Sequence, residues 1–273
     1  MNTIIFHSKD IELASKIFSG FGAEVEPKYS HIRIHTDKLI DLNDLRSEHK
    51  LDFNYLPDFF DFNNASLFIS DMDSTLINIE CIDEIADYGK VKREVAAITE
   101  QAMNGEIDFG VALTERVALL SGLDINVLGK VYEERLQVNQ GGKELIKFFR
   151  NKCIKTAVVS GGFTYFTDRL SRDLDIDYSL ANSLVIEDGK LAGTIAGHIV
   201  DAASKANFVH ELCEINSVLP EQVIVVGDGA NDLEMMSIAG LSVAFHAKPY
   251  VLENSNVAIN YSGLDKIIDF FDD

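Results

Sequence analysis

The chain has 273 residues, and 47% of them are hydrophobic, so it is long enough to bury a substantial core. It carries 44 Asp and Glu residues against 24 Lys and Arg residues, a formal net charge of −20. This balance argues against nucleic acid and anionic membranes as partners, because both are bound through basic surfaces. A small anionic substrate would need local positive charge, from a metal ion or a few placed cations.

The three Cys residues lie far apart, at positions 81, 153 and 213, and form no C-x-x-C pair. This spacing is typical of free thiols in a reducing compartment. The N-terminus lacks a basic segment followed by a long apolar one, and no apolar run approaches the roughly 18–20 residues of a membrane span. We therefore expect a cytoplasmic protein.

Residues 1–62 predict a small α+β module. Patterns typical of strand, helix, strand, strand, helix and strand follow in that order: "TIIFHS", "DIELASKIFSGFG", "AEVEPKYS", "HIRIHTD", "DLNDLRSEH" and "LDFNYLP". The order βαββαβ suits a ferredoxin-like or ACT-like module. Pro57 and the Asn63-Asn64 pair are turn residues, and they place the boundary to a second domain, residues 63–273, near residue 62.

Residues 63–273 alternate apolar strands with helical segments. The strands are "LFIS", "KTAVVSGGF", "QVIVVGDGAND" and "LSVAFHA", and residues 79 to about 138 are helical in pattern. Asp188-Gly189, between two apolar runs, predicts a β-hairpin. Apolar strands separated by helices predict an α/β fold with a doubly wound parallel sheet. Active sites of such sheets lie at the carboxyl ends of the strands.

Acidic side chains gather at these predicted strand ends. Asp71 and Asp73 follow "SLFIS" and would share one face if the strand geometry persists. Asp228 ends "VIVVG", and Asp232 begins the next helix. Such carboxylates would repel one another without a cation, and oxygen-only ligands favour Mg²⁺. Helix N-capping is the alternative for any single Asp, but it explains the whole set poorly.

Two further features suit a phosphate group. Ser160-Gly161-Gly162 follows "AVV" and offers a hydroxyl and bare backbone N–H groups, although a plain turn is the more common meaning of such a sequence. Lys205 adds a mobile point charge that could reach the same phosphate, whereas a single Lys is usually solvated surface.

Four segments in order resemble the motifs of the haloacid dehalogenase superfamily. "DMDSTLI" resembles its D-x-D-x-T motif, "VVSGG" its second motif, and Lys205 and "GDGANDLEMM" its third and fourth. "DMDSTLINIECIDEIA" and "VVSGGFTYFTDRL" are most similar to members that act on O-phospho-L-serine. The resemblance implies a helical cap inserted at about residues 79–138, and Mg²⁺-dependent hydrolysis of phosphoserine, the last step of serine biosynthesis. The alternative is another small phosphomonoester, or phosphoryl transfer to a second alcohol.

The resemblance also implies roles for the strand-end residues. Asp71 would be the nucleophile that forms an aspartyl-phosphate, and Asp73 the general acid and base. The metal would be bound by Asp71, Asp228 and the backbone carbonyl of Asp73, with Asp232 orienting its water shell. The phosphate would be held by Ser160, Gly161, Lys205 and Asn231.

The cap offers a candidate for the rest of the substrate. Phe109, Leu113, Val117 and Leu120 form one helical stripe, and Arg116, seven residues after Phe109, lies on that face. An Arg that points into the cap interior needs an anion. A buried ion pair with a cap carboxylate would supply one, and the resemblance implies the carboxylate of phosphoserine instead.

Three other cap residues gain a role only from the resemblance. With Ile79, Ile82 and Ala86 as the apolar face, Glu80 falls on an ordinary solvated helical face; the resemblance makes it the partner of the substrate ammonium. Met103 and Phe109 match cap residues that shield the site, and each alone is an ordinary core residue. The resemblance further suggests that the N-terminal module binds an amino acid or supports a homodimer. A purely structural role for this module is an equally good interpretation of the sequence.

Two other classes of protein share parts of this pattern. A receiver domain also places an Asp, nearby acids, a Lys and Mg²⁺ at strand ends. It needs neither an Asp two residues after the acceptor nor a long helical insertion, so the sequence disfavours it. A catalytically inactive binding protein is disfavoured because no motif position is lost.

Overall fold

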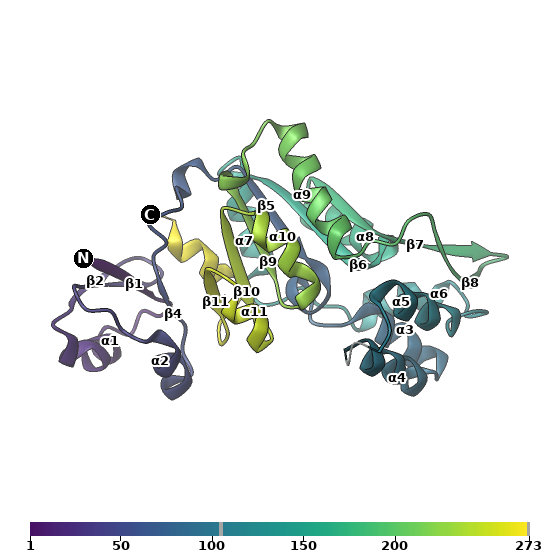
Figure 1. Ribbon diagram of the computed structural model, residues 1–273, viewed down its shortest axis with the longest axis horizontal. Coiled ribbons are helices and arrows are strands. Elements are labelled where there is room, and N and C mark those ends of the chain that lie inside the picture. Colours follow the sequence, from purple (N-terminus) through teal and green to yellow (C-terminus); the bar gives the residue numbers. More distant parts are fainter. Residues whose placement is uncertain (104–105, 272–273) are drawn as a thin grey trace.

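The structure, a computed structural model, describes residues 1–103 and 106–271. It contains a four-stranded sheet near the N-terminus and a seven-stranded sheet, with a group of helices beyond the carboxyl ends of the central strands (Figure 1). No helix in the described ranges combines the length and the apolarity that a membrane crossing requires. The thiols of Cys81, Cys153 and Cys213 are free, as expected from their spacing.

The N-terminal sheet has the order β2-β3-β1-β4, and all of its pairs are antiparallel. Asp10 and Asp41 cap its two helices through their side chains. The predicted βαββαβ order is confirmed. The elements are β1 (Asn2–Phe6), α1 (Ile11–Phe18), β2 (Glu24–Pro27), β3 (Ile32–Thr36), α2 (Leu42–His49) and β4 (Phe53–Tyr55).

The large sheet has the order β11-β10-β9-β5-β6-β7-β8, parallel except for the β7–β8 pair. This confirms the predicted α/β class. The strands are β5 (Leu67–Asp71), β6 (Lys155–Phe163), β7 (Tyr178–Glu187), β8 (Lys190–Ala196), β9 (Val223–Gly227), β10 (Leu241–Phe245) and β11 (Val257–Ile259). The helices that cover it are α7 (Gly142–Asn151), α8 (Thr164–Leu174), α9 (Ala202–Asn216), α10 (Leu233–Ile238) and α11 (Pro249–Glu253).

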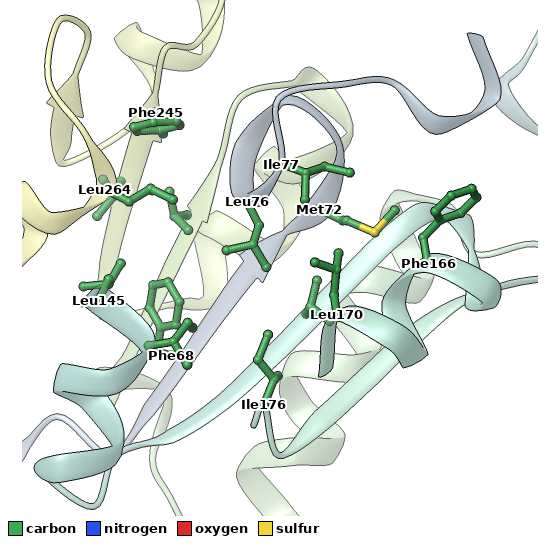
Figure 2. Close-up of a cluster of buried hydrophobic side chains, with 14 of the residues drawn as sticks. Phe68, Met72, Leu76, Ile77, Leu145, Phe166, Leu170, Ile176, Phe245 and Leu264 are labelled. Atoms are coloured by element: carbon green, nitrogen blue, oxygen red, sulfur yellow. The ribbon is translucent and has the colours of Figure 1, made fainter. Parts of the chain in front are cut away.

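The apolar run of β5 is buried because both faces of the sheet are covered. Phe68 packs with α7 and α8 on one face, whereas its neighbours Leu67 and Ile69 pack with α9 and α10 on the other. Figure 2 shows Phe68 in the first of these cores, with Leu145 of α7 and Leu170 of α8. Each such side chain contributes about 1.5–3 kcal/mol. Strand β5 is thereby fixed at the centre of the sheet.

The predicted helical insertion is confirmed between β5 and α7. Its helices are α3 (Cys81–Gly89), α4 (Lys92–Met103), α5 (Phe109–Ala118) and α6 (Asn126–Glu134), while residues 104–105 lie outside the described residues. An antiparallel bridge between Ile77 and Val138 joins the two chain segments that lead into and out of the cap. The cap therefore rests on a narrow two-stranded connection.

The β7–β8 hairpin turns through Asp188 (φ 48°) and Gly189 (φ 74°), as the Asp-Gly pair predicts for a type I′ turn. The hairpin also contacts the cap. The Gly122 N–H donates to the Leu191 carbonyl, and the Leu191 N–H donates to the Leu123 carbonyl, both at 2.8 Å. The cap is thus attached to the large sheet at a second place.

The N-terminal sheet docks on the edge strand β11 of the large sheet. The Asn54 side chain donates to the Ala258 carbonyl at 2.9 Å and accepts from the Ala258 N–H at 3.0 Å, as a neighbouring strand would. His7, which directly follows β1, hydrogen-bonds to the buried carboxylate of Asp269 at 2.9 Å. Unpaired backbone groups of an edge strand can pair with another chain and cause aggregation, and Asn54 satisfies two such groups of β11.

Candidate active site

The carboxyl ends of β5, β6 and β9 meet beneath the cap and border a cavity of about 440 Å³. The cavity brings together ten of the twelve site residues that the sequence predicts: Asp71, Asp73, Glu80, Met103, Phe109, Arg116, Ser160, Gly161, Asp228 and Asn231. The other two, Lys205 and Asp232, are buried behind Asp71.

Lys205 is fixed between two carboxylates. Its Nζ donates to Asp71 Oδ1 at 2.5 Å and to Asp232 Oδ1 at 2.7 Å, and it is only 1% exposed. Burial opposes its charge, but Asp232 and Asp71 outweigh burial and raise the pKa of Lys205. Burial, followed by the charge of Asp232, raises the pKa of Asp71 well above its usual range. The expectation of a mobile charge at position 205 was wrong, because α9 places this Lys beneath the sheet edge.

Asp73 reaches the cavity through a turn. Strand β5 ends at Asp71, and the chain reverses at Ser74, whose φ of 59° is left-handed. The Asp73 carboxylate accepts hydrogen bonds from the Cys81 N–H at 2.8 Å and the Ser160 hydroxyl at 2.9 Å. Burial raises the pKa of Asp73 despite these bonds. The two carboxylates line one cavity as expected, but a turn, and not continued strand geometry, brings them there.

Ser160, Gly161 and Gly162 do not form a plain turn, which is the more common structure for such a sequence. They lie in the irregular end of β6, where its register with β7 shifts, and α8 begins only at Thr164. A Cβ at Gly162 would lie 2.6 Å from Asp73 Oδ2, and one at Gly161 would lie 3.0 Å from the ring of Phe109. A side chain at position 162 would therefore displace the Asp73 carboxylate, and one at position 161 would push the Phe109 ring by a few tenths of an ångström.

The acidic groups at this edge form a candidate cation site. Asp71, Asp228 and Asp232 offer oxygen atoms that all lie within 4.8 Å of one another. Burial and the charge of Asp232 raise the pKa of Asp228 to about 6. Oxygen donors and unbalanced negative charge fit a hard divalent cation. Asp232 Oδ2 already accepts from two backbone N–H groups and Oδ1 from Lys205, so Asp71 and Asp228 are the freer ligands.

Glu80 does not lie on a solvated face of a helix, so that interpretation was wrong. It immediately precedes α3, lines the cavity, and accepts a hydrogen bond from the Ser74 hydroxyl at 2.6 Å. The side chain is exposed to the cavity, yet partial removal from water and the charge of Asp73 raise the pKa of Glu80 to about 7. A cationic group of a ligand would restore its charge.

Arg116 lies on the predicted apolar face of α5, where Leu113, Val117 and Leu120 are buried. Its guanidinium donates to the Ala112 carbonyl at 3.2 Å and to the Thr99 hydroxyl at 3.4 Å. In the described ranges no carboxylate lies within 4.0 Å of it, so the alternative, an ion pair within the cap, is not formed. The Arg116 charge remains free for a ligand anion.

The two apolar cap residues differ in exposure. Met103 is 68% exposed at the end of α4, and Phe109 is half-buried at the start of α5; both line the cavity. The interpretation of Met103 as a core residue was wrong. Met103 is an exposed residue that lines the cavity.

Sequence reasoning missed three residues at this site. The Thr75 hydroxyl donates to Asp228 Oδ1 at 3.0 Å, Thr99 contacts Arg116, and Lys248 lines the cavity from the segment after β10. Two of them had a signal: Thr75 is the threonine of the D-x-D-x-T motif, and Lys248 follows a strand whose carboxyl end lies at the same sheet edge.

A larger cavity of about 780 Å³ lies elsewhere, between α6, α7 and α8. Its charged groups partly satisfy one another, as in the Arg150–Asp175 ion pair at 2.5 Å. It lacks the converging buried carboxylates that the 440 Å³ cavity has, so we assign the chemistry to the smaller cavity.

This site thus combines acids at parallel strand ends, a buried Lys held between two of them, and an inserted helical cap. The sequence model of the haloacid dehalogenase-like hydrolases matches residues 65–240, and the chain belongs to this family. A phosphoserine phosphatase of Albidiferax ferrireducens is 51% identical over 214 residues, which are 77% of this chain and 90% of that protein.

Two solved structures extend the comparison. A haloacid dehalogenase family hydrolase from Salmonella enterica serovar Typhi is 30% identical and superposes with a TM-score of 0.91 over 100% of this chain and 98% of its own. A phosphoserine phosphatase described as a phospho-aspartyl intermediate analogue is 38% identical, with a TM-score of 0.71 over 76% of this chain and 99% of its own.

Proposed function

We propose that this chain is an Mg²⁺-dependent phosphatase that hydrolyses O-phospho-L-serine to L-serine and phosphate, the last step of serine biosynthesis. The observation that carries the proposal is the placement of Arg116 and Glu80 in one cavity with Asp71. Each charged group of phosphoserine thus has a partner: the carboxylate at Arg116, the ammonium at Glu80 and the phosphate at the sheet edge. The relatives named phosphoserine phosphatase support the same substrate.

In the proposed reaction, Asp71 attacks phosphorus and the bond between phosphorus and the serine oxygen breaks. Asp73, whose pKa is raised, gives the departing oxygen its proton and then takes one from the attacking water. Water forms the new bond to phosphorus as the aspartyl bond breaks, and phosphate leaves. The cation, held by Asp71, Asp228 and the Asp73 carbonyl, would offset charge on the phosphoryl oxygens.

Other residues would position these groups. Lys205 fixes Asp71 through the 2.5 Å contact, and Ser160 fixes Asp73. Backbone N–H groups near Gly161 and the Asn231 side chain would bind phosphoryl oxygens from the cavity wall. The cap covers the cavity and would exclude bulk water.

Arg116→Ala is expected to raise KM for O-phospho-L-serine by roughly 10- to 100-fold, because it removes a charge-assisted partner of the carboxylate. Steady-state kinetics with O-phosphoethanolamine, which lacks that carboxylate, should show little change and serves as the control. Equal losses with both substrates, or no change in KM for phosphoserine, would contradict the role of Arg116.

The Glu80 pKa of about 7 predicts a pH dependence of binding. Below that pH the carboxyl is protonated in the free protein and cannot pair with an ammonium, so KM for phosphoserine should rise as pH falls from 8 to 6. Phosphoglycolate lacks the ammonium, so the ratio of the two KM values isolates Glu80 from other titrating groups. In Glu80→Gln this ratio should be independent of pH; an unchanged slope in the variant would refute the assignment.

Phosphate release from phosphoserine should continue for many turnovers with Mg²⁺ and stop when EDTA is added. A receiver domain would instead stop at one phosphate per chain. If the chain turns over other small phosphomonoesters and not phosphoserine, or transfers phosphate to an added alcohol, the alternative haloacid dehalogenase activities apply.

We also propose the division into residues 1–62 and 63–273, with the cap at about 79–138. The separate sheets β1–β4 and β5–β11 support it. The contacts of Asn54 with strand β11 and of His7 with Asp269 favour a structural role for the N-terminal module. A cytoplasmic location and a homodimer remain proposals from the sequence.

A further inference from the structure

Negative charge dominates the walls of the 440 Å³ cavity. Among the described residues, five carboxylates line it, namely Asp71, Asp73, Glu80, Asp83 and Asp228, against the two cationic side chains Arg116 and Lys248. The whole chain carries a net charge of −20. A phosphomonoester dianion approaching this cavity is therefore repelled by both the walls and the surrounding surface, and the placement of each cation matters for binding.

The two cations lie on opposite walls. Arg116 belongs to α5 of the cap, whereas Lys248 lies between β10 and α11 at the edge of the large sheet. The Lys248 N–H donates to the Asp228 carbonyl at 3.3 Å, which ties its backbone to the loop that carries the proposed metal ligand. Lys248 is thus placed at the phosphate end of the cavity, and Arg116 at the cap end.

The Lys248 side chain is also free to act. It is exposed, and within the described part of the chain no carboxylate oxygen lies within 4.0 Å of its Nζ. Lys205, by contrast, is buried and already shared between Asp71 and Asp232. A flexible four-carbon stem lets an unpaired ammonium follow a phosphate over several ångströms.

We propose that Lys248 determines the preference of this site for dianionic phosphate esters, by attracting the phosphoryl group to the sheet edge and holding it there before the chemical step. This inference rests on the proposed phosphatase function and deepens it. Lys248 contributes to ground-state binding, so it acts on KM more than on kcat.

The test uses the full chain with Mg²⁺ and the variants Lys248→Met and Lys248→Arg. Lys248→Met should raise KM for O-phospho-L-serine about tenfold, the effect of losing one hydrogen bond from a charged group, with kcat changed less than about threefold. Lys248→Arg should stay near the wild type. Because salt screens the net repulsion of the dianion, kcat/KM should rise with added salt, and this rise should be steeper in Lys248→Met.

Lys16→Met is the matched control, because Lys16 is exposed on α1 of the N-terminal module and its loss changes the net charge equally. An unchanged KM in Lys248→Met, a fall in kcat alone, or an equal effect of Lys16→Met would overturn the proposal. Titration calorimetry with inorganic phosphate and Mg²⁺ gives an independent measurement. If the wild type does not hydrolyse phosphoserine, the proposed function fails, whereas weaker phosphate binding by Lys248→Met would still support this role and unchanged binding would refute it.

Discussion

Replacing Asp71 with Asn is expected to lower kcat for phosphoserine by about 10⁴-fold or more, because an amide oxygen cannot form the acyl-phosphate bond. The change removes one charge and nearly preserves the side-chain shape. Because burial disfavours the Asp71 charge, the neutral Asn should fit the site without loss of the fold. Phosphate release and thermal unfolding, measured on the same preparations, separate the two effects.

The control for Asp71→Asn is Asp58→Asn, an equal change of charge at an exposed position away from the cavity. It should retain wild-type kcat. Activity of Asp71→Asn within tenfold of the wild type would contradict the assignment of Asp71 as nucleophile, and a collapsed thermal transition would show that the side chain is needed for folding.

Lys205→Met is expected to lower the free energy of unfolding by about 3–5 kcal/mol in metal-free buffer, because it leaves two buried carboxylates without their cation. Asp71, whose pKa burial already raises, can relieve this loss by binding a proton in the folded state. Groups of this kind cost more stability as the pH rises. The loss should therefore be greater at pH 8 than at pH 5, as measured by urea denaturation.

The double variant Lys205→Met/Asp232→Asn should recover part of the lost stability, since it removes one of the two unpaired charges. A Lys205→Met protein as stable as the wild type at pH 8 would contradict the buried ion-pair network. No recovery in the double variant would indicate that lost packing of the Lys stem, and not charge, is responsible.

The sequence was sufficient where local pattern decides structure. The apolar strand "LFIS" has both faces covered, and the Asp188-Gly189 pair has the positive φ angles of its turn, so both were predictable. The proximity of Asp71 and Asp228 was predictable as well, because the carboxyl ends of parallel strands meet at one edge of a sheet.

The remaining features depend on contacts between distant segments. Lys205 is buried against Asp71, 134 positions away, and Gly161 lies against the ring of Phe109, which belongs to the cap. Glu80 was misplaced because α3 begins only at Cys81, so Glu80 is its N-cap, with an extended backbone (φ −95°, ψ 109°), and does not lie on a helical face. The periodicity of apolar residues does not reveal such contacts or the first residue of a helix. Both decide whether a side chain faces solvent or the cavity.

This site is expected to hydrolyse phosphoserine and to recognise its amino-acid part. The most direct measurement compares kcat/KM for O-phospho-L-serine and O-phosphoethanolamine in the presence of Mg²⁺. A preference for phosphoserine of roughly 100-fold is predicted, from the single contact between Arg116 and the carboxylate. Equal values for the two substrates, or no turnover of phosphoserine, would contradict the account.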